Sequence, residues 1–397
     1  MFENIIAQAS VVERLQTEVR AQLVPPTLLF CGPDYAGKSS TALELARAIT
    51  CTSGDSAVPW ACSCRSCTQQ RHLLHPETLL LGGRYFHREI SVAAAAVKRN
   101  DIRPLRFLLE RSVRKLTRRF DSVLWEGDTA RVKKADPILE KLDEALAPYL
   151  PDSAEAVGRD FAKGLDDVVD LCGKLAGVTN LDAVPVDAIR RLSAWSHISP
   201  RGPAKVAILE NVDRLGDSAR NALLKTLEEP PGGVYFVLTT QRKGAVMATI
   251  LSRSRVYGFG VRDVQESHTV IKRIFRDETA DQTSIRDYFM GMSGYALRPL
   301  ADRFVRGCLA ETELELGLLA EIEQAIGAVG AQEGFLTFAV ELTELFREAL
   351  RAGDGTKRRV VQAWQQLLSE WIHRVESYRI QPGRALEAIY YGMRDVA

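Results

Sequence analysis

The chain has 397 residues, a length that favours two or three domains over a single core. Hydrophobic residues make up 46% and charged residues 26%, as in soluble globular proteins. The formal net charge is +1, so the molecule as a whole exerts no strong electrostatic pull on nucleic acid. No apolar run approaches the roughly 18–20 residues that span a bilayer, and the N-terminus lacks the features of a signal peptide, so we expect a cytoplasmic protein.

The first predicted element is a helix near the N-terminus. Val12, Leu15 and Val19 recur at helical spacing, and Ser10 with Glu13 fits a capping box at the helix start. Short apolar runs then predict buried strands at 27–31, 78–81, 206–209 and 234–239, with a weaker one near Val256. Buried strands that alternate with helices predict an α/β fold whose parallel sheet is covered on both faces.

A long segment between the second and third strands does not follow this alternation. Apolar residues there recur at helical spacing, so we expect a helical insertion at about residues 83–185, joined to the sheet at both ends. Eight lysines or arginines lie between Arg111 and Lys134, against three acidic residues. We interpret them as a solvated helix face, with a DNA-facing or partner-facing patch as the alternative. From about Val261 onward the pattern is helical throughout.

A glycine-rich loop follows the first strand and precedes a helix. Gly32, four further residues and then Gly37-Lys38-Ser39 match the phosphate-binding loop, and the strand before it and helix after it are the context that supports the match. Glycines let backbone N–H groups approach phosphate oxygens, and the helix N-terminus favours negative charge. We therefore predict ATP and Mg²⁺ as ligands, with Lys38 on the β- and γ-phosphates and Ser39 on the metal. A chance glycine–lysine turn is the less favoured alternative.

The strand at 206–209 ends in Glu210 and Asn211, where phosphate-loop ATPases carry acidic residues. Glu210 can accept hydrogen bonds from metal-bound water, or it is simply a charge at the end of a strand. Asn211 has no carboxylate and cannot act as a base near neutral pH. We therefore predict that the chain holds ATP and hydrolyses it weakly. Asp213 is a possible substitute base, although its position normally points elsewhere.

The eleven-residue string Asn-Ala-Leu-Leu-Lys-Thr-Leu-Glu-Glu-Pro-Pro at 221–231 resembles the bacterial clamp-loader AAA+ family, that is, the delta-prime and gamma/tau subunits of DNA polymerase III. Residues 1–8 and, more weakly, residues 381–387 are also similar to that family. The resemblance implies an AAA+ nucleotide-binding domain at 1–260, a helical lid at 261–305 and an all-helical collar, which forms the oligomer, at 306–397. It does not extend to the insertion.

The resemblance also implies roles for individual residues. Arg253 would be an arginine finger acting on the ATP of a neighbouring subunit, because it ends a segment similar to the family's Ser-Arg-Cys motif, with Ala248 and Ser254 as departures. Arg298 lies in a sensor-2-like segment, although Pro299 follows it. The residues expected to bind nucleotide are Gly32, Gly37, Lys38, Ser39, Ser40, Thr240 on the sensor-1 strand, and Arg298; Glu210 and Asn211 form a degenerate Walker B pair.

Four of the seven cysteines cluster at Cys51, Cys62, Cys64 and Cys67. In a reducing compartment such clustering suggests metal rather than disulfides, and four thiolates suit structural Zn²⁺. The place of the cluster after the loop helix corresponds to a zinc module of the family, here at residues 51–67. Cys64-x2-Cys67 has ordinary finger spacing, whereas Cys62-x-Cys64 departs from it. Free buried thiols, or a site that has lost its metal, are the alternatives.

These features predict a delta-prime-like clamp-loader subunit. Its partners would be the other loader subunits (gamma/tau and delta), the sliding clamp and primed DNA within the complex. The degenerate Glu210-Asn211 pair favours this role over the alternative, an active gamma/tau-type ATPase. A free-standing phosphate-loop kinase would need a small-substrate motif that we do not find. A zinc-dependent DNA-binding module is disfavoured by the near-zero net charge.

Overall fold

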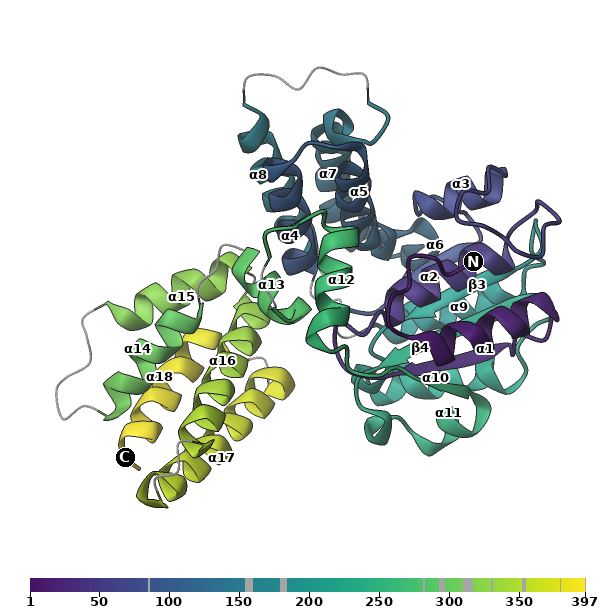
Figure 1. Cartoon of the computed structure of the whole chain (residues 1–397). Helices are drawn as coiled ribbons and strands as arrows, with labels where there is room; N and C mark the ends of the chain where they lie inside the picture. The colour runs from purple at the N-terminus through teal and green to yellow at the C-terminus, as the bar shows by residue number, and fades with distance from the viewer. Residues whose placement is uncertain are drawn as a thin grey trace. The chain divides into compact units, whose positions relative to one another are not determined.

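The computed structural model describes residues 1–84, 86–153, 160–178, 184–280, 283–292, 297–309, 317–329, 331–351, 355–378 and 380–396. Two compact units divide the chain, Met1–Phe289 and Met290–Ala397. The first contains the sheet, its covering helices and the helical segment between β2 and β3 (Figure 1). Among the described helices, none is both long and apolar enough to cross a membrane.

The first unit is built on a parallel sheet with strand order β2-β3-β4-β1-β5. Its strands are β1 Thr27–Cys31, β2 Thr78–Leu81, β3 Lys205–Leu209, β4 Val234–Thr240 and β5 Arg255–Gly258. All five predicted strands are therefore confirmed, as is the α/β fold class. The central strands are buried on both faces, which is why each is a continuous apolar run rather than an alternating one.

Alternate residues of the strands belong to two separate hydrophobic cores, one on each face of the sheet. Leu28 and Phe30 pack with the helices on one face, and Leu29 and Leu209 pack with those on the other. The first face is covered by α1 Ala9–Arg20 and α2 Lys38–Ile49, and the second by α9 Val186–His197, α10 Asp217–Glu228 and α11 Ala248–Arg253 (Figure 1). This sandwich holds the carboxyl ends of β1, β3 and β4 together at one edge.

The predicted capping box at Ser10 is wrong. Helix α1 begins at Ala9, so Ser10 lies inside the helix, and its N-cap Gln8 makes no side-chain cap hydrogen bond. The Gln8 amide instead donates to the Gly260 carbonyl at 3.0 Å and accepts from the Gly260 N–H at 3.1 Å. Contact with the chain after β5 therefore takes the place of local capping.

Between β2 and β3 the described chain is helical and has its own hydrophobic core. The helices are α4 Phe86–Arg99, α5 Arg103–Thr117, α6 Ser122–Trp125, α7 Thr129–Leu146 and α8 Phe161–Gly177, with 3-10 turns at Arg118–Phe120 and Ala147–Tyr149. Leu109, Leu142 and Leu165 meet in this core, whereas Leu124 and Trp125 of α6 join the core of the sheet. The insertion is thus a helical body attached to the sheet edge through α6.

The basic residues of α5 and of the turn after it do not form the solvated face that the sequence suggested, nor a patch free for DNA. Arg111, Arg114 and Arg118 donate to backbone carbonyls of the α3–β2 segment, for example Arg114 to His72 at 2.8 Å and Arg118 to Thr78 at 2.7 Å. A buried arginine is tolerated when its N–H groups find acceptors, and here the acceptors are backbone carbonyls between Arg71 and Thr78. These cations attach the insertion to the sheet domain.

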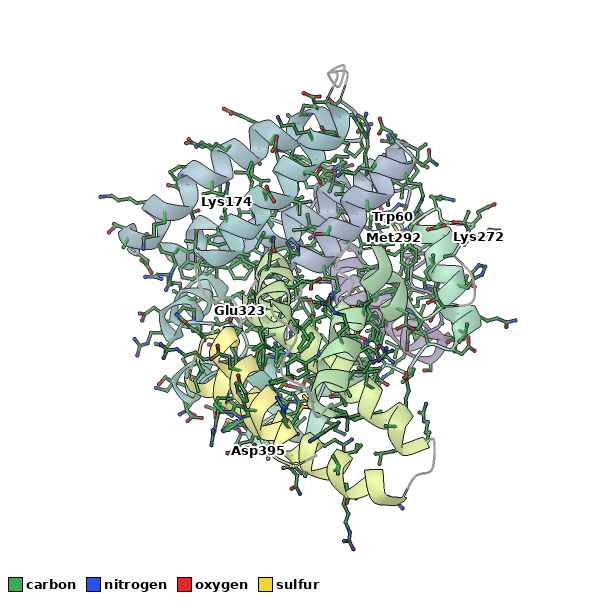
Figure 2. The ribbon with its side chains drawn as sticks, turned by 90° about the vertical axis from the view of Figure 1, so that its left-hand side faces the viewer. Trp60, Lys174, Lys272, Met292, Glu323 and Asp395 are labelled. Atoms are coloured by element: carbon green, nitrogen blue, oxygen red, sulfur yellow. The ribbon has the colours of Figure 1, made fainter. Side chains whose placement is uncertain are left out.

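The remaining α-helices before α14 are α3 Arg65–Arg71, α12 Val264–Ile274 and α13 Ile285–Met292, and α13 crosses the boundary between the two units. Asp263 and Glu266 form a capping box at the start of α12. Figure 2 marks α8 by Lys174 and α12 by Lys272, both of which are exposed. The other unit is a helical assembly around a separate core, with α14 Leu297–Leu309, α15 Leu318–Val329, α16 Ala331–Arg351, α17 Gly355–Tyr378 and α18 Pro382–Arg394.

Candidate nucleotide-binding site and metal centre

The phosphate-binding loop connects β1 to α2, and its backbone requires glycine at two positions. Gly37 has φ 94°, in the left-handed region, and a Cβ there would lie 2.7 Å from a guanidinium nitrogen of Arg262. A Cβ on Gly32 would lie 2.4 Å from the carbonyl oxygen of Phe259. Both glycines therefore allow close approach of the chain that follows β5, and they place the N-terminus of α2 at the sheet edge.

Lys38 is the first residue of α2, and its side chain is folded back onto the loop. The ammonium donates to the carbonyls of Gly32 at 2.7 Å and Pro33 at 2.6 Å. Burial lowers the pKa of Lys38, and the carboxylates of Asp34 and Glu210 oppose that effect. The ammonium can exchange these carbonyls for phosphate oxygens without leaving the loop.

A cavity of about 860 Å³ adjoins this loop within the first unit, a size that suits a small-molecule ligand. Ile5, Val270 and Ile274 supply apolar surface for a base, and the loop residues 34–40 form the opposite part of the wall. The positively charged lining consists of Lys38, Arg71, Arg84, Arg88, Arg103, Arg111, Lys115, Arg262, Arg273 and Arg276, against the acids Asp34, Glu44, Glu89, Asp152 and Glu210. This excess of cations suits a polyphosphate.

Glu210 ends β3 at the floor of the cavity, and both of its carboxylate oxygens are engaged. Oε1 accepts from the Ser39 hydroxyl and from Arg84 at 3.1 Å, and Oε2 accepts from Arg119. Burial alone would raise the pKa of Glu210, but Arg84 and Arg119 outweigh it and hold this pKa below its ordinary value. Glu210 is thus an ionised partner in a buried ion-pair network rather than an exposed charge at the end of a strand.

These contacts bear on whether Mg²⁺ fits the site. Magnesium requires near-octahedral oxygen ligands and retains several waters. Ser39, the expected ligand, is bonded to Glu210, which was expected to hold metal-bound water, and two guanidinium groups lie against the same carboxylate. The arrangement that the structure shows does not fit a divalent cation.

Asn211 follows Glu210 in the left-handed conformation, with φ 54°. Its side-chain amide donates to the Gly83 carbonyl at 2.8 Å. The neighbouring Gly82 has φ 89°, and a Cβ there would lie 2.1 Å from the Glu210 carbonyl oxygen, so the ends of β2 and β3 approach as closely as backbones can. Asn211 is held in a structural contact and carries no group that could take a proton from water.

Asp213, the possible substitute base, has both carboxylate oxygens in use. It accepts from the Thr240 hydroxyl at 2.8 Å and from Arg242 at 3.3 Å. Thr240 is buried and does not line the cavity, whereas its neighbour Thr239 does. The nucleotide contact predicted for Thr240 therefore stays a prediction, and Thr239 is the threonine that this structure places at the cavity wall.

The other residues predicted to bind nucleotide lie in two places. Ser40 is on α2 and lines the cavity with the rest of the loop. Arg298 is on α14 in the C-terminal unit, where it pairs with Glu348 at 2.6 Å and Glu341 at 3.6 Å. Residues 293–296 of the sensor-2-like segment lie outside the described residues, and the role of Arg298 stays a prediction.

Arg253, the predicted arginine finger, is the last residue of α11. Its guanidinium donates to Glu228 of α10 at 2.9 Å, and its side chain is 34% exposed. Ion pairs at the protein surface contribute little to stability, roughly 0–1 kcal/mol, and can exchange partners. The arginine is thus accessible on the surface of the unit.

Several site residues were not apparent from the sequence. Arg84 and Arg119 contact Glu210 from the insertion, Gln241 donates to Asp34 of the loop at 2.5 Å, and Arg262 donates to the Tyr35 carbonyl. The position of Gln241 directly after the sensor-1 strand was a signal that could have identified it. The two insertion arginines lie outside every motif that was identified in the sequence, so no motif marked them.

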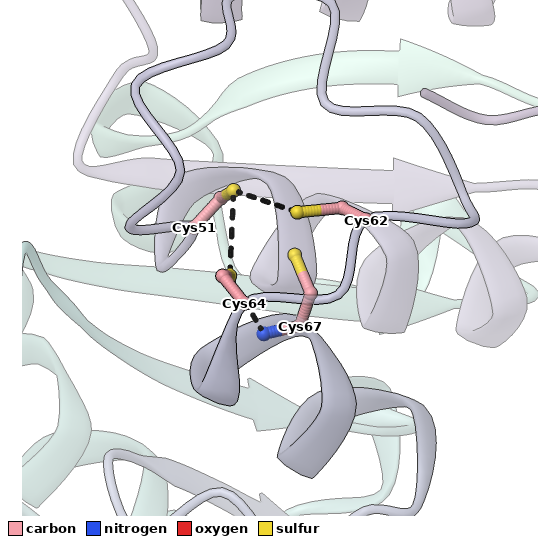
Figure 3. A group of neighbouring side chains, drawn as sticks. All are labelled: Cys51, Cys62, Cys64 and Cys67. Carbon is pink, nitrogen blue, oxygen red and sulfur yellow. Dashed lines mark hydrogen bonds between the residues drawn. The ribbon is translucent and has the colours of Figure 1, made fainter.

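The four clustered cysteines converge beside α2. Figure 3 shows their sulfur atoms turned toward one another, with Cys51 Sγ 3.8 Å from Cys62 Sγ and 3.8 Å from Cys64 Sγ. The four sulfur atoms all lie within 4.8 Å of one another. Tetrahedral zinc with Zn–S bonds of about 2.3 Å separates its sulfur ligands by about 3.8 Å. The cluster therefore fits zinc, and the unusual Cys62-x-Cys64 spacing does not prevent convergence.

The local environment favours the thiolate form of Cys64, whereas burial raises the pKa of Cys67. Burial raises the pKa of Cys64, but hydrogen bonds from the backbone N–H groups of Cys67 and Thr52 outweigh it and lower this pKa to about 6. Arg47 of α2, a fully buried residue, donates to the Cys67 sulfur at 3.2 Å and to Glu44 at 2.5 Å. This arginine offsets part of the negative charge of four thiolates and links the cysteine module to the helix of the phosphate-binding loop.

Acidification is expected to destabilise this region through His75. Its Nδ1 accepts from the Glu77 N–H at 3.2 Å and its Nε2 contacts the Ser66 hydroxyl at 3.1 Å. Burial, reinforced by Arg118, lowers the pKa of His75 to about 4. Because the unfolded ring titrates near 6.5, the unfolded state takes up the proton first, and up to about 3 kcal/mol of stability is lost between pH 6.5 and about 4.

Urea denaturation between about pH 7 and about pH 4 tests this expectation against the His75→Asn variant, which keeps an acceptor near the Nδ1 position but does not titrate. The variant should lose less stability than the natural chain over this interval. The difference between the two losses is then due to the histidine, because both chains contain the same cysteines. Equal losses in the two chains would contradict the assignment.

Comparisons with known proteins agree with the family resemblance seen in the sequence but correct its extent, because the match includes most of the insertion. The family model described as "DNA polymerase III, delta subunit" matches residues 7–144 and 166–262, more than half of the chain. The tau subunit of DNA polymerase III from Salmonella typhimurium is 27% identical over 278 residues, which are 61% of this chain and 41% of that protein. The delta-prime subunit from Yersinia pestis is 42% identical over 73 residues, which are 18% of this chain and 21% of that protein.

The chain spans about two fifths or less of the length of these relatives. Among solved structures, a DNA polymerase III gamma subunit-related protein from Thermotoga maritima covers 98% of this chain and is itself covered to 99%, with 15% sequence identity. Its TM-score of 0.41 is too low for this likeness to carry an argument. The match to the family model confirms the family that the 221–231 string indicated: this chain belongs to the DNA polymerase III delta-subunit family, with delta-prime, tau and gamma subunits among its relatives.

Proposed function

We propose that the chain is a delta-prime-like subunit of a bacterial clamp loader, a cytoplasmic complex in which it helps place a sliding clamp on primed DNA together with gamma/tau and delta subunits. The observation that carries the proposal is that Asn211 has an amide side chain held in a structural hydrogen bond. An amide stands where an active ATPase of this class needs a carboxylate, and its nitrogen is bonded to Gly83. The subunit would hold nucleotide and contribute little hydrolysis of its own.

ATP binding is supported by the glycine loop at the N-terminus of α2 and by the cation-rich cavity beside it. Lys38 would bind the terminal phosphates after leaving the carbonyls of Gly32 and Pro33. The apolar surface of Ile5, Val270 and Ile274 would take the base. Bound nucleotide then orders the loop against the chain after β5, which gives the ligand a structural role.

The catalytic contribution proposed for this subunit is the surface arginine. Arg253 donates to the partially exposed carboxylate of Glu228 and to the Thr249 carbonyl and Ser252 hydroxyl of its own helix, and a neighbouring subunit's ATP can replace these surface partners. A guanidinium supplied in trans neutralises charge that develops on the transferred phosphoryl group. In this arrangement the chain would hydrolyse little ATP and yet be required for hydrolysis next door.

A structural zinc ion completes the proposal. The four cysteines would occupy all positions of a tetrahedral metal, which leaves none open for chemistry. Zinc would tie the segment after α2 to α3, and the resulting module would be a rigid surface on the sheet domain.

An active gamma/tau-type ATPase is the second candidate, because a tau subunit aligns over 61% of this chain, against 18–31% for delta-prime subunits. The two candidates differ in which residue of this chain the complex needs. A motor needs its own Lys38, whereas a subunit that acts in trans needs Arg253.

Purification of the chain with its candidate partners, followed by ATPase assays with primed DNA and clamp, tests the proposal. We expect the chain to enter the complex and Lys38→Ala in this subunit to leave ATP hydrolysis by the complex within about twofold, because Lys38 serves a site that turns over weakly. Loss of nearly all hydrolysis in Lys38→Ala would favour the motor instead. Failure of the chain to assemble with clamp-loader subunits would contradict both candidates.

A further inference from the structure

The two arginines that pair with Glu210, Arg84 and Arg119, come from the insertion, and Arg119 is held by several contacts. Arg119 has a side chain that is 2% exposed, and besides Glu210 it donates to the Gly82 carbonyl at 2.9 Å and the Lys115 carbonyl at 3.2 Å. Its guanidinium also lies over the ring of Phe86, 5.3 Å from the centroid. Release of Arg119 would break all of these contacts, so it is a fixed charge beside the carboxylate.

The second cation, Arg84, is placed differently. Its side chain is 23% exposed, it lines the cavity, and it bridges Glu210 at 3.1 Å and Glu89 at 2.8 Å. Lys115 pairs with the same Glu89. Three cations therefore surround two carboxylates, which leaves one positive charge in excess at the edge of the phosphate site.

This arrangement opposes a divalent cation at the position where phosphate-loop proteins hold Mg²⁺. The metal is ordinarily bound by the loop Ser or Thr and an acidic residue at the end of a later strand. Here those two groups, Ser39 and Glu210, bond to each other. A metal ion at this point would have to separate them and would then face the guanidinium of Arg119 at close range.

The same geometry provides a substitute for the metal. A guanidinium has five N–H donors in a rigid fork, so the contacts of Arg84 to two carboxylates leave donors for a phosphate. Lys38 and Arg262 line the cavity with it, on the side of the glycine loop. A triphosphate at the loop would therefore meet fixed positive charge from the insertion.

We propose that this site binds a nucleoside triphosphate without a divalent cation, and that Arg84 supplies the charge that Mg²⁺ supplies in other phosphate-loop proteins. The proposal rests on the nucleotide binding proposed above and deepens it. Without the metal, the phosphates lack the ion that bridges and polarises them for hydrolysis, which agrees with a subunit that holds ATP without turning it over.

Calorimetric titration of the full chain with ATP, in buffer with magnesium and in buffer with EDTA, tests the proposal. We expect the two dissociation constants to agree within about threefold. Arg84→Ala should weaken binding in EDTA by about tenfold or more, and magnesium should not restore it, because Arg119 still lies against Glu210. Arg84→Lys, which keeps the charge, should bind in EDTA more tightly than Arg84→Ala.

Arg131→Ala is the matched control. Arg131 also belongs to the insertion, pairs with an acidic residue, Asp128 at 3.2 Å, and has a comparable side-chain exposure of 29%, but it does not line the cavity. The affinity of the Arg131→Ala variant for ATP should equal that of the natural chain in both buffers. Circular dichroism of every variant confirms that the helices are intact before binding is compared.

The possible results separate this inference from the proposed function. ATP binding by the natural chain that tightens tenfold or more on addition of magnesium would overturn the metal-free site and leave nucleotide binding intact. Unchanged binding by folded Arg84→Ala in EDTA would overturn the role of Arg84. Absence of ATP binding in both buffers would overturn the inference and the proposed nucleotide site together.

Discussion

Replacement of Arg253 by alanine is expected to lower hydrolysis of the ATP held by the neighbouring subunit about 10³-fold or more, which is the effect that arginine fingers have in nucleotide hydrolases. The arginine is exposed and its one described ion pair, to Glu228, is at the surface, so its loss should cost the isolated chain little stability. The large effect is expected only in the complex, at the neighbour's ATP. Steady-state phosphate release with clamp and primed DNA measures it.

Two variants make this result specific. Arg253→Lys keeps the charge but loses the planar fork, and it should recover only a small part of the activity. Arg255→Ala removes a half-exposed arginine two residues further on, which pairs with Glu18 at 3.2 Å, and it should leave hydrolysis nearly unchanged. Full activity of Arg253→Ala in a complex that has demonstrably incorporated it would rule out the finger.

Removal of zinc is expected to have the second large effect. Structural zinc contributes roughly 10–16 kcal/mol of apparent binding free energy in zinc-finger peptides at neutral pH, and that energy is folding energy. Treatment with a strong chelator should release one zinc ion per chain, disorder the segment from Cys51 to α3, and lower the melting temperature of the first unit by about 10 °C or more. A colorimetric zinc assay and thermal unfolding followed by circular dichroism give the two quantities.

Cysteine variants test the same site from the protein side. Cys67→Ser removes one buried sulfur of the cluster and should purify with little zinc. Cys172→Ala removes a buried cysteine of α8 that lies in the core of the insertion, and it should keep its zinc. A natural chain that carries no metal when purified with zinc present, and melts at the same temperature with and without chelator, would show that the four cysteines act as packed thiols.

The strands and the ligand-binding motifs could be predicted because each depends on adjacent residues. Short apolar runs identified β1 to β4, since strands buried on both faces are mostly apolar, whereas the partly exposed β5 gave only a weak run. Gly32, Gly37 and Lys38 carry the phosphate loop within a few residues of each other. The cysteines likewise signalled their site by clustering in the sequence before the structure placed their sulfur atoms together.

What could not be predicted depends on contacts between distant segments. Arg119 reaches Glu210, 91 residues away along the chain, and a lone arginine on a helix gives no sign of such a partner. The same holds for the start of α1, where Ser10 suggested a cap but the contact of Gln8 with Gly260 decides where the helix begins. Local patterns are weak where tertiary contacts compete with them.

The wrong interpretation of the α5 cations has the same origin. A helix rich in arginine looks solvated in the sequence, because the sequence does not show the carbonyls of the α3–β2 segment that lie opposite. Long cationic side chains can be buried when backbone acceptors surround them. Such acceptors become visible only when the chain is folded.

The strand order has a consequence for the synthesis of the protein. Strand β1 pairs with β4 and β5, and β2 pairs with β3. The first two strands to be synthesised, β1 and β2, therefore do not pair with each other. At roughly 5–20 residues per second the ribosome needs about 6–25 s to make the ~120 residues between β2 and β3. During that time the emerged strands lack their sheet partners, whereas α4, α5, α7 and α8 already contain their own core. The insertion is therefore the part of the first unit that can fold earliest, and the nucleotide site is assembled onto it last.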